Sequence, residues 1–277
     1  MYVIYSSVST HSQASNTSSK YEYYYNNDAA NEDETVMVEN KINNTSLEEL
    51  EDVYNTQAPP LDTDPDSITV LVNKNLGLAN DFVPSHLVIP DILFEINYYD
   101  EKKLMKRDAS NALEELFKSS EDSGLNLYAI SGYRSYARQN SIYKENISTK
   151  GELLTNQYSA KPGFSEHQTG LCMDVSTPSI CNRLEDVFEG TPEGKWLAEN
   201  AHLYGFIIRY PKDKESITGY SYEPWHIRFV GTKLAQYLYT NDLTLEEYYN
   251  QAPSTNTSDP LIHDSGEEDS TSAEEPK

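Results

Sequence analysis

The chain has 277 residues and carries 45 Asp and Glu against 21 Lys and Arg, a formal net charge of −24. This acidity excludes nucleic-acid binding through phosphate contacts, which need clustered basic residues, and it excludes electrostatic adhesion to anionic lipid. No apolar run approaches the roughly 20 residues that cross a bilayer, and two cysteines are too few for a disulfide scaffold or a four-cysteine zinc site.

The excess acid lies at the two ends of the chain. Residues 1–66 hold 13 acidic and 2 basic residues, and residues 250–277 hold 7 acidic residues and 1 basic residue. Such segments hold too little apolar surface to offset the conformational entropy lost on ordering. We predict a disordered acidic, Tyr-rich tether over 1–66 and a disordered acidic tail over 250–277. A contact site is the alternative interpretation of the tyrosine cluster at 21–25.

The middle of the chain is suited to one folded domain. Residues 67–249 hold 25 acidic and 18 basic residues, which is ordinary for a soluble domain. This stretch is long enough to bury an interior and short enough to be a single unit. The sequence as given shows no complete signal peptide, because its apolar start, Met1–Tyr5, is short and lacks basic residues.

Hydrophobic periodicity predicts short strands and helices in irregular order. Apolar residues spaced three and four apart indicate helices, and short β-branched or aromatic runs bounded by turn residues indicate strands. In chain order we expect a strand at 68–72, a helix at 103–118, a strand at 125–130, a polar helix at 135–147, a strand at 171–175, a helix at 193–204, strands at 206–208 and 225–230, and a helix at 232–239. Gly205 suits a left-handed helix end, and Thr244 with Glu247 matches a capping box. Because no regular βαβ alternation recurs, we expect an α+β fold with a small, mostly antiparallel sheet flanked by helices.

The first candidate functional segment surrounds His167. This histidine precedes Gly170 and the strand at 171–175, on which Cys172 and Asp174 share one face. An Asp in an apolar strand is costly to bury unless a charge pairs with it, and either a metal ion or an arginine would serve. The spacing of His167 and Asp174 also arises by chance in many proteins, so this segment alone leaves both interpretations open.

The second candidate segment is Glu223-Pro-Trp-His-Ile-Arg228. Pro224 disfavours a helix, so the pattern indicates a turn that leads into a strand. His226 then points away from the core-facing side of the strand, and Glu223 is free to lean over the same face. Two imidazoles and one carboxylate make a three-ligand zinc site with an open fourth position, and a second carboxylate that does not bind the metal can carry the proton.

Several motifs taken together resemble one enzyme family. Ser165-x-His167-x-x-Gly170-x-x-x-Asp174, followed by Glu223-x-Trp225-His226-x-Arg228, resembles the zinc D-alanyl-D-alanine carboxypeptidases of the VanY type, which belong to the LAS metallopeptidases. The resemblance covers residues 70–248 and includes Val72-Asn-Lys74, Ser131-Gly-Tyr-Arg-Ser135, and Trp196-Leu-x-x-Asn200 with Tyr204-Gly-Phe206-x-x-Arg209-Tyr-Pro211. It implies a LAS/DD-peptidase-like fold and a zinc carboxypeptidase domain over 67–249.

The resemblance also implies the roles of the site residues. His167, Asp174 and His226 would bind one Zn²⁺ per chain, and Glu223 would act as general base and then as general acid. Arg134 would meet the substrate at its terminal carboxylate or at the developing oxyanion, because a guanidinium presents a planar fork of donors. A structural ion pair is the alternative for Arg134. Further residues expected to line the substrate cleft are Gln139, Ser165, Tyr210 and Trp225, of which Trp225 has core packing as its alternative.

One residue departs from the family pattern. Cys172 stands where the family is expected to have a small residue such as Ala. It has three interpretations: a disulfide with Cys181, packing as a small hydrophobic side chain, or competition for the zinc ion.

The function implied by the resemblance is removal of the C-terminal D-Ala from peptidoglycan stem peptides by metal-activated water. The alternatives are an LD-carboxypeptidase acting on tetrapeptide stems, a cell-wall endopeptidase, and a non-catalytic zinc-bearing binding module. Because peptidoglycan lies outside the cytoplasmic membrane, we expect an extracytoplasmic protein, in the cell envelope or secreted. We expect a monomer with peptidoglycan stem peptides as its partners, no nucleic acid, and no membrane span in this chain.

Overall fold

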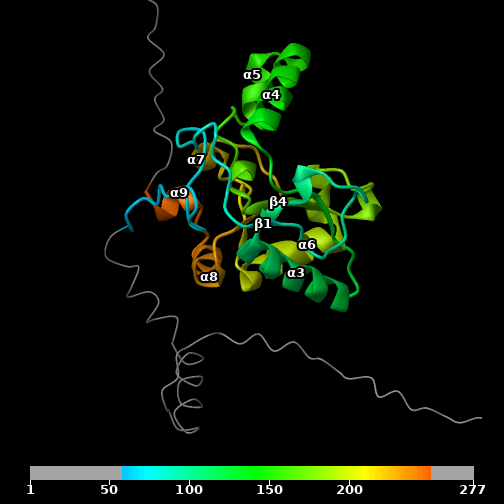
Figure 1. Cartoon of the computed structure of the whole chain (residues 1–277). Helices are drawn as coiled ribbons and strands as arrows, with labels where there is room; N and C mark the ends of the chain where they lie inside the picture. The colour runs from blue at the N-terminus through cyan, green and yellow to red at the C-terminus, as the bar shows by residue number, and fades with distance from the viewer. Residues whose placement is uncertain (1–57, 251–277) are drawn as a thin grey trace, which may run out of the picture. The chain divides into compact units, whose positions relative to one another are not determined.

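The computed structural model describes residues 58–250 (Figure 1). Residues 1–57 and 251–277, which hold most of the predicted tether and tail, lie outside the described residues, and those two predictions stay predictions. Near the start of the described part, the Asp66 carboxylate pairs with the Lys106 ammonium at 2.8 Å. No helix in the described part of the chain is both long enough and apolar enough to span a bilayer.

The centre of the fold is a four-stranded sheet in the order β3-β4-β6-β5, in which every pair of neighbours is antiparallel. Its strands are β3 (Tyr128–Ser131), β4 (Cys172–Ser176), β5 (Phe206–Ile208) and β6 (His226–Phe229). A separate antiparallel pair is formed by β1 (Leu87–Val88) and β2 (Met105–Lys106). The expected α+β fold with a small antiparallel sheet is therefore confirmed, and β4 and β6 occupy the middle of the sheet.

Helices flank this sheet. The α-helices are α3 (Arg107–Asp122), α4 (Tyr136–Lys150), α5 (Glu152–Tyr158), α6 (Pro192–Asn200), α7 (Glu215–Thr218), α8 (Thr232–Thr240) and α9 (Leu245–Tyr248). The 3-10 helices are η1 (Glu101–Lys103), η2 (Glu166–Thr169), η3 (Pro178–Ile180), η4 (Asp186–Gly190) and η5 (Ala201–Tyr204). Figure 1 shows α3 and α6 on one side of the strands, whereas α4 and α5 form a hairpin that projects from the body.

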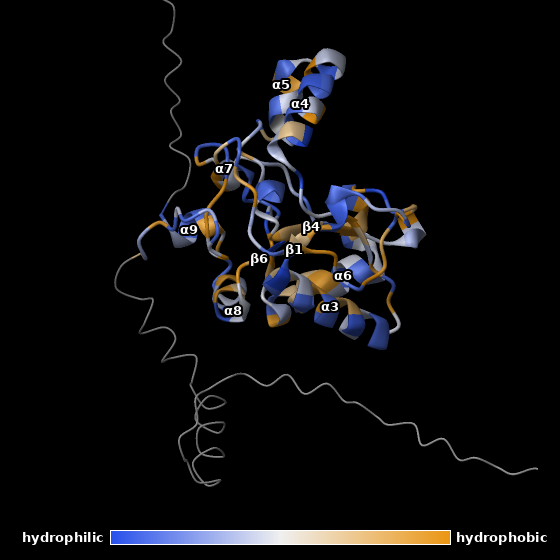
Figure 2. Cartoon of the chain, viewed as in Figure 1, coloured by the Kyte–Doolittle hydropathy of each residue, from blue (hydrophilic) through white to orange (hydrophobic). Residues whose placement is uncertain are grey.

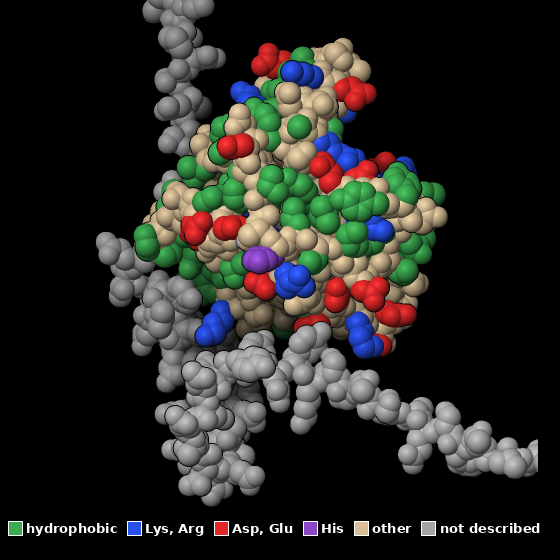
Figure 3. Space-filling view, in the orientation of Figure 1, with side chains coloured by type: hydrophobic (Ala, Val, Ile, Leu, Met, Phe, Trp, Pro, Cys, Tyr) green, Lys and Arg blue, Asp and Glu red, His purple; other side chains and the backbone are tan. Residues whose placement is uncertain are grey.

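The core is built by the apolar stripes that the sequence predicts. In α3, Ala109, Leu113, Leu116 and Phe117 recur at helical spacing and are all buried. They pack in one cluster with the apolar face of β4, including Met173. Figure 2 shows apolar residues around the central strands and α6, whereas α4 and α5 are largely hydrophilic. Acidic and basic side chains are interspersed over the face shown in Figure 3, as the modest charge of the middle segment predicts.

The segment at 68–72 differs from prediction. The predicted strand is wrong, because these residues form turns and irregular backbone. The carbonyls of Ile68 and Val70 accept hydrogen bonds from the Arg228 guanidinium, at 3.0 and 2.8 Å, and the carbonyl of Thr69 accepts one from the Tyr249 hydroxyl at 3.0 Å. Side chains from distant parts of the chain thus satisfy the acceptors that a β-ladder would otherwise use.

Helix boundaries follow the predictions with two adjustments. The helix expected at 103–118 begins only at Arg107, because Met105 and Lys106 pair with β1. The helix expected at 193–204 is α-helical to Asn200 and continues as the 3-10 helix η5, which ends at Gly205 with φ +82°. The left-handed glycine and the capping box that begins α9 are both confirmed.

Candidate active site

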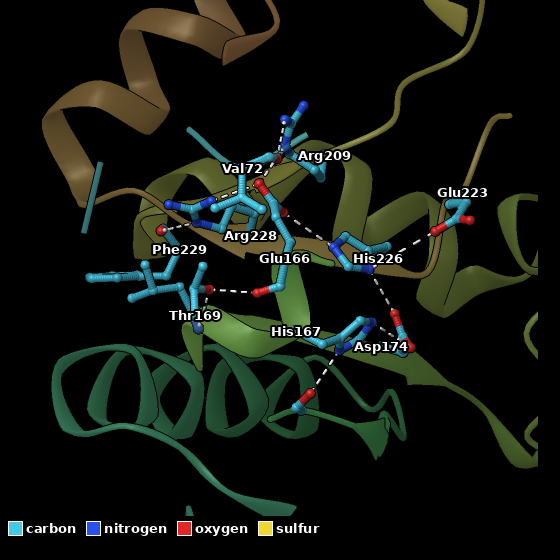
Figure 4. Close-up of polar contacts among 12 residues, drawn as sticks. Val72, Glu166, His167, Thr169, Asp174, Arg209, Glu223, His226, Arg228 and Phe229 are labelled. Carbon is cyan, nitrogen blue, oxygen red and sulfur yellow. Dashed lines mark hydrogen bonds and ion pairs between the residues drawn. The ribbon is translucent and has the colours of Figure 1, made fainter. Parts of the chain in front are cut away.

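The register of the two central strands brings the candidate residues together. Asp174 on β4 lies directly opposite His226 on β6. His167 lies in η2, and Gly170 then joins η2 to β4 in the left-handed conformation with φ +67°. A Cβ at Gly170 would come within 2.8 Å of the Leu87 side chain, so the turn needs glycine for both space and conformation. Figure 4 shows the two histidines and Asp174 pointing toward one another.

Three donor groups converge in a buried position. The Asp174 carboxylate lies 2.9 Å from His226 Nδ1 through one oxygen and 3.4 Å from His167 Nε2 through the other. The two imidazole rings are nearly perpendicular, with centroids 5.0 Å apart. Exposure of these three residues is 6% or less. Two imidazole nitrogens and a carboxylate at such separations fit a divalent metal of zinc type.

The outer nitrogen of each histidine has a hydrogen-bond acceptor. His167 Nδ1 donates to the carbonyl of Gly132 at 2.7 Å, which leaves the Nε2 lone pair facing Asp174. Burial and the charge of Arg134 lower the pKa of His167 to about 3, so this imidazole is neutral, as a ligand must be. His226 Nε2 lies 3.4 Å from a Glu166 carboxylate oxygen, which leaves Nδ1 facing Asp174.

The pKa of His226 is shifted in the opposite direction to that of His167. Burial lowers its pKa, but Cys172 and hydrogen bonds to Asp174 and Glu166 outweigh burial and hold the pKa well above its usual value. In the metal-free chain this ring therefore carries a proton that a bound metal would displace.

Cys172 lies on the same face of β4 as Asp174. One nitrogen of each site histidine and the Cys172 sulfur lie within 4.8 Å of one another, so the thiol is a possible soft donor. However, Cys172 is fully buried, burial raises the pKa of its thiol, and it does not line the cavity that Asp174 lines. Asp174 is thus the better-placed third donor. Cys172 and Cys181 are both free thiols, so the structure has no disulfide between them.

Glu223 lies beside these donors without joining them. Its Oε2 atom is 3.9 Å from His226 Nδ1, and backbone hydrogen bonds to Tyr210 and His226 fix the turn that carries it. Burial, reinforced by Asp174 and opposed by His226 and Arg134, raises the pKa of Glu223 to about 7. A carboxylate with this pKa is suited to accepting and returning a proton near neutral pH.

A polar cavity of about 140 Å³ opens over the three donors. Its lining includes Arg134, Ser165, Tyr210, Glu223 and Trp225, which are sequence-predicted site residues, and also Tyr158, Ser159, Ala160, Glu166 and Tyr220. Trp225 lines this cavity and also packs partly against the main core cluster. The Tyr220 hydroxyl is buried there without a hydrogen-bond partner.

Arg134 is the only Lys or Arg among the described residues that line this cavity. Its guanidinium donates to Gln139 Oε1 at 2.9 Å and to Ser131 Oγ at 3.2 Å. Gln139, predicted to line the cleft, is instead buried behind Arg134 and donates through its amide to the carbonyl of Ala160 at 2.6 Å. Gln139 thus connects Arg134 to the wall of the cavity.

The sequence interpretation missed several of these residues. Tyr158 ends α5, Ser159 and Ala160 follow it, and no local pattern marks these three as cavity residues. Glu166 lies inside a recognised motif, but its partners come from distant parts of the chain. Its burial, which only the structure shows, requires a charged partner for the carboxylate.

The antiparallel sheet, the paired imidazoles and the adjacent carboxylates around one cavity define a LAS-type peptidase. The family model of VanY, described as D-alanyl-D-alanine carboxypeptidase, matches residues 102–232. The chain is 49% identical over 185 residues to "Putative carboxypeptidase YodJ" of Bacillus subtilis (strain 168), a match that covers 67% of this chain and 68% of that protein.

Two solved structures are also similar. One is that of the LdcB LD-carboxypeptidase, at 48% identity and a TM-score of 0.66, covering 68% of this chain and 88% of that one. The other is a mutant of the vancomycin-resistance D,D-pentapeptidase VanY in complex with Zn(II), at 32% identity and a TM-score of 0.52, covering 65% and 97%. The chain belongs to the VanY family of D-alanyl-D-alanine carboxypeptidases.

Proposed function

We propose that this protein is a zinc-dependent carboxypeptidase that removes a terminal D-alanine from peptidoglycan stem peptides. The observation that carries the proposal is the convergence of two imidazole nitrogens and one carboxylate beside a second carboxylate that stays outside the donor set. His167, Asp174 and His226 would hold the metal, and residues 67–249 would form the catalytic domain. The zinc-bound relative supports this metal.

The chemistry follows from the positions of the side chains. Zinc held by these donors would polarise the scissile carbonyl and lower the pKa of the attacking water. Glu223, whose Oε2 atom lies 3.9 Å from His226 Nδ1, would accept a proton from the attacking water and deliver it to the amine that leaves as the C–N bond breaks. The buried Tyr210 and the half-buried Trp225 both line the cavity in which this reaction would take place.

Arg134 supplies the preference for a chain end. It is the cationic side chain in the described lining, and its planar fork of donors suits a free carboxylate. The contact with Gln139 holds that fork in place. An enzyme that anchors the terminal carboxylate acts at the chain end, whereas an endopeptidase needs no such anchor.

The closer structural match favours a second candidate. The LD-carboxypeptidase LdcB is 48% identical to this chain, against 32% for the D,D-acting VanY. Cleavage of the tetrapeptide stem is therefore the alternative to cleavage of the pentapeptide stem. Both substrates end in D-alanine, so the same anchor and the same metal chemistry serve either reaction. Both stems lie outside the cytoplasmic membrane, and we propose that the protein acts there.

Mass spectrometry of muropeptides tests the proposal. A mixture of pentapeptide and tetrapeptide stems is incubated with the purified protein, with and without a zinc chelator. We expect loss of one alanine that the chelator abolishes, and the stem that shortens identifies D,D or L,D specificity. Cleavage at internal bonds would show an endopeptidase. Zinc binding without any cleavage would show a binding module.

A further inference from the structure

A buried network of charges lies directly behind one of the metal-site histidines. Glu166, Arg209, Arg228 and Glu246 have fully buried side chains and contact one another. Both arginines donate to the same Glu166 oxygen, Oε1, at 2.7 Å from Arg209 Nε and 2.6 Å from Arg228 Nη1. The other oxygen, Oε2, is left to face His226 Nε2 at 3.4 Å (Figure 4).

Both arginines are themselves fixed by other groups. Arg209 makes two hydrogen bonds to the Glu246 carboxylate, at 2.7 and 2.8 Å. Arg228 donates to the carbonyls of Ile68 and Val70. Because each guanidinium is held from two sides, the Glu166 carboxylate cannot rotate without losing a charged partner. Its orientation is therefore set by the fold, independently of the metal site.

We propose that Glu166 is a positioning residue for the metal centre, which holds His226 with Nε2 protonated and Nδ1 directed at the metal. The proposal rests on the metal-binding role of His226 in the proposed function. A buried ion network of this kind contributes little net stability compared with apolar packing. An acceptor on the outer nitrogen of a ligating histidine, in contrast, fixes its tautomer and ring orientation. Glu166 provides that acceptor for His226, as the Gly132 carbonyl does for His167.

The isosteric substitution Glu166→Gln makes the test specific. The two arginine donors both require an oxygen at the Oε1 position, so the amide oxygen of Gln would stay there. The NH₂ group would then face His226 Nε2 and turn that nitrogen into an acceptor. The ring would be protonated on Nδ1 instead, which is the nitrogen that must be free for a metal.

Zinc affinity is the readout, measured by competition with a chromophoric chelator. We expect Glu166→Gln to weaken zinc binding by about 10- to 100-fold. The matched control is Glu246→Gln, which removes a carboxylate from Arg209 in the same buried network but does not contact His226. We expect the control to lower the melting temperature as Glu166→Gln does, yet to bind zinc within about threefold of the unmodified chain. Equal zinc affinity in the two variants would overturn the proposal.

A second measurement keeps the proposal testable if Glu166→Gln does not fold. In the unmodified chain, loaded with cadmium-113 and labelled with nitrogen-15 on histidine, we expect scalar coupling of the metal to His226 Nδ1 and His167 Nε2. The His226 Nε2 proton should persist. Metal coupling to His226 Nε2 would overturn the proposal. Failure of the unmodified chain to bind metal would refute the proposed function itself, so the two failures are distinguishable.

Discussion

Replacing the proposed general base with its uncharged isostere separates catalysis from metal binding. Glu223→Gln keeps the side-chain shape, and Glu223 lies 3.9 Å from His226 without belonging to the three converging donors. Zinc binding should therefore persist. General acid–base catalysis by one carboxylate contributes about 10²- to 10⁴-fold, so kcat should fall by that factor, which corresponds to about 3–5 kcal/mol in the activation free energy.

The same substitution should not destabilise the metal-free chain. Burial raises the pKa of Glu223 from 4.5 to about 7. An acid with a raised pKa in the folded state lowers stability as pH rises above its unfolded value, and here the full penalty is about 3 kcal/mol once the pH exceeds 7. We therefore expect metal-free Glu223→Gln to melt at or above the temperature of the unmodified chain at pH 8.

The assay pairs muropeptide turnover with zinc content, both on purified protein. Asp122→Asn is the control, because Asp122 is exposed at the end of α3 and its carboxylate pairs with Lys118. The control should keep its activity within about twofold, as expected for a surface substitution. If Glu223→Gln keeps more than about one-tenth of the original activity, Glu223 is not the general base. Loss of zinc from the variant would show that Glu223 is a ligand.

Three further predictions concern substrate anchoring, packing and acid stability. Arg134→Ala should reduce kcat/KM by about 10- to 100-fold on peptides with a free terminal carboxylate. Arg138→Ala, which removes an ion pair with Asp100 outside the cavity lining, should leave kcat/KM unchanged. Unchanged kinetics in Arg134→Ala would argue for endopeptidase specificity. In urea denaturation, Gly194→Ala should lower the free energy of unfolding by about 1–3 kcal/mol or more, because the new Cβ would lie 2.0 Å from a backbone oxygen. Gly190→Ala, with open space at the Cβ position, should change that free energy by less than about 0.5 kcal/mol. The hydrogen bond from Lys106 lowers the pKa of Asp66, so the stabilisation by this pair is present above the unfolded pKa and lost as pH falls through the folded pKa. Asp66→Asn should therefore reduce the fall in melting temperature between neutral and acidic pH. An unchanged fall would contradict the role of Asp66.

Several features of this protein follow from local sequence alone. The period-2 alternation of β4 and β6 places Asp174 and His226 on the polar face of each strand, and the antiparallel register of the two strands then sets them opposite each other. Apolar residues at helical spacing predict α3 and its buried face. Gly205 and the Thr244 capping box mark helix ends because these signals act within a few residues. The family motifs supply the identity of the donors and of Glu223.

Other features required the tertiary structure. The stretch at 68–72 has the composition of a strand, yet Arg228, about 160 residues away, takes its carbonyls as hydrogen-bond acceptors. The sequence presents Glu166 as an ordinary polar turn residue, but in the fold it pairs with Arg209, which directly follows β5, and with Arg228 on β6. These outcomes depend on which charged groups meet in the interior, where desolvation forces every charge to find a partner. Local patterns therefore determine most of the elements and the candidate donors, whereas the tertiary structure decides which buried charges surround those donors.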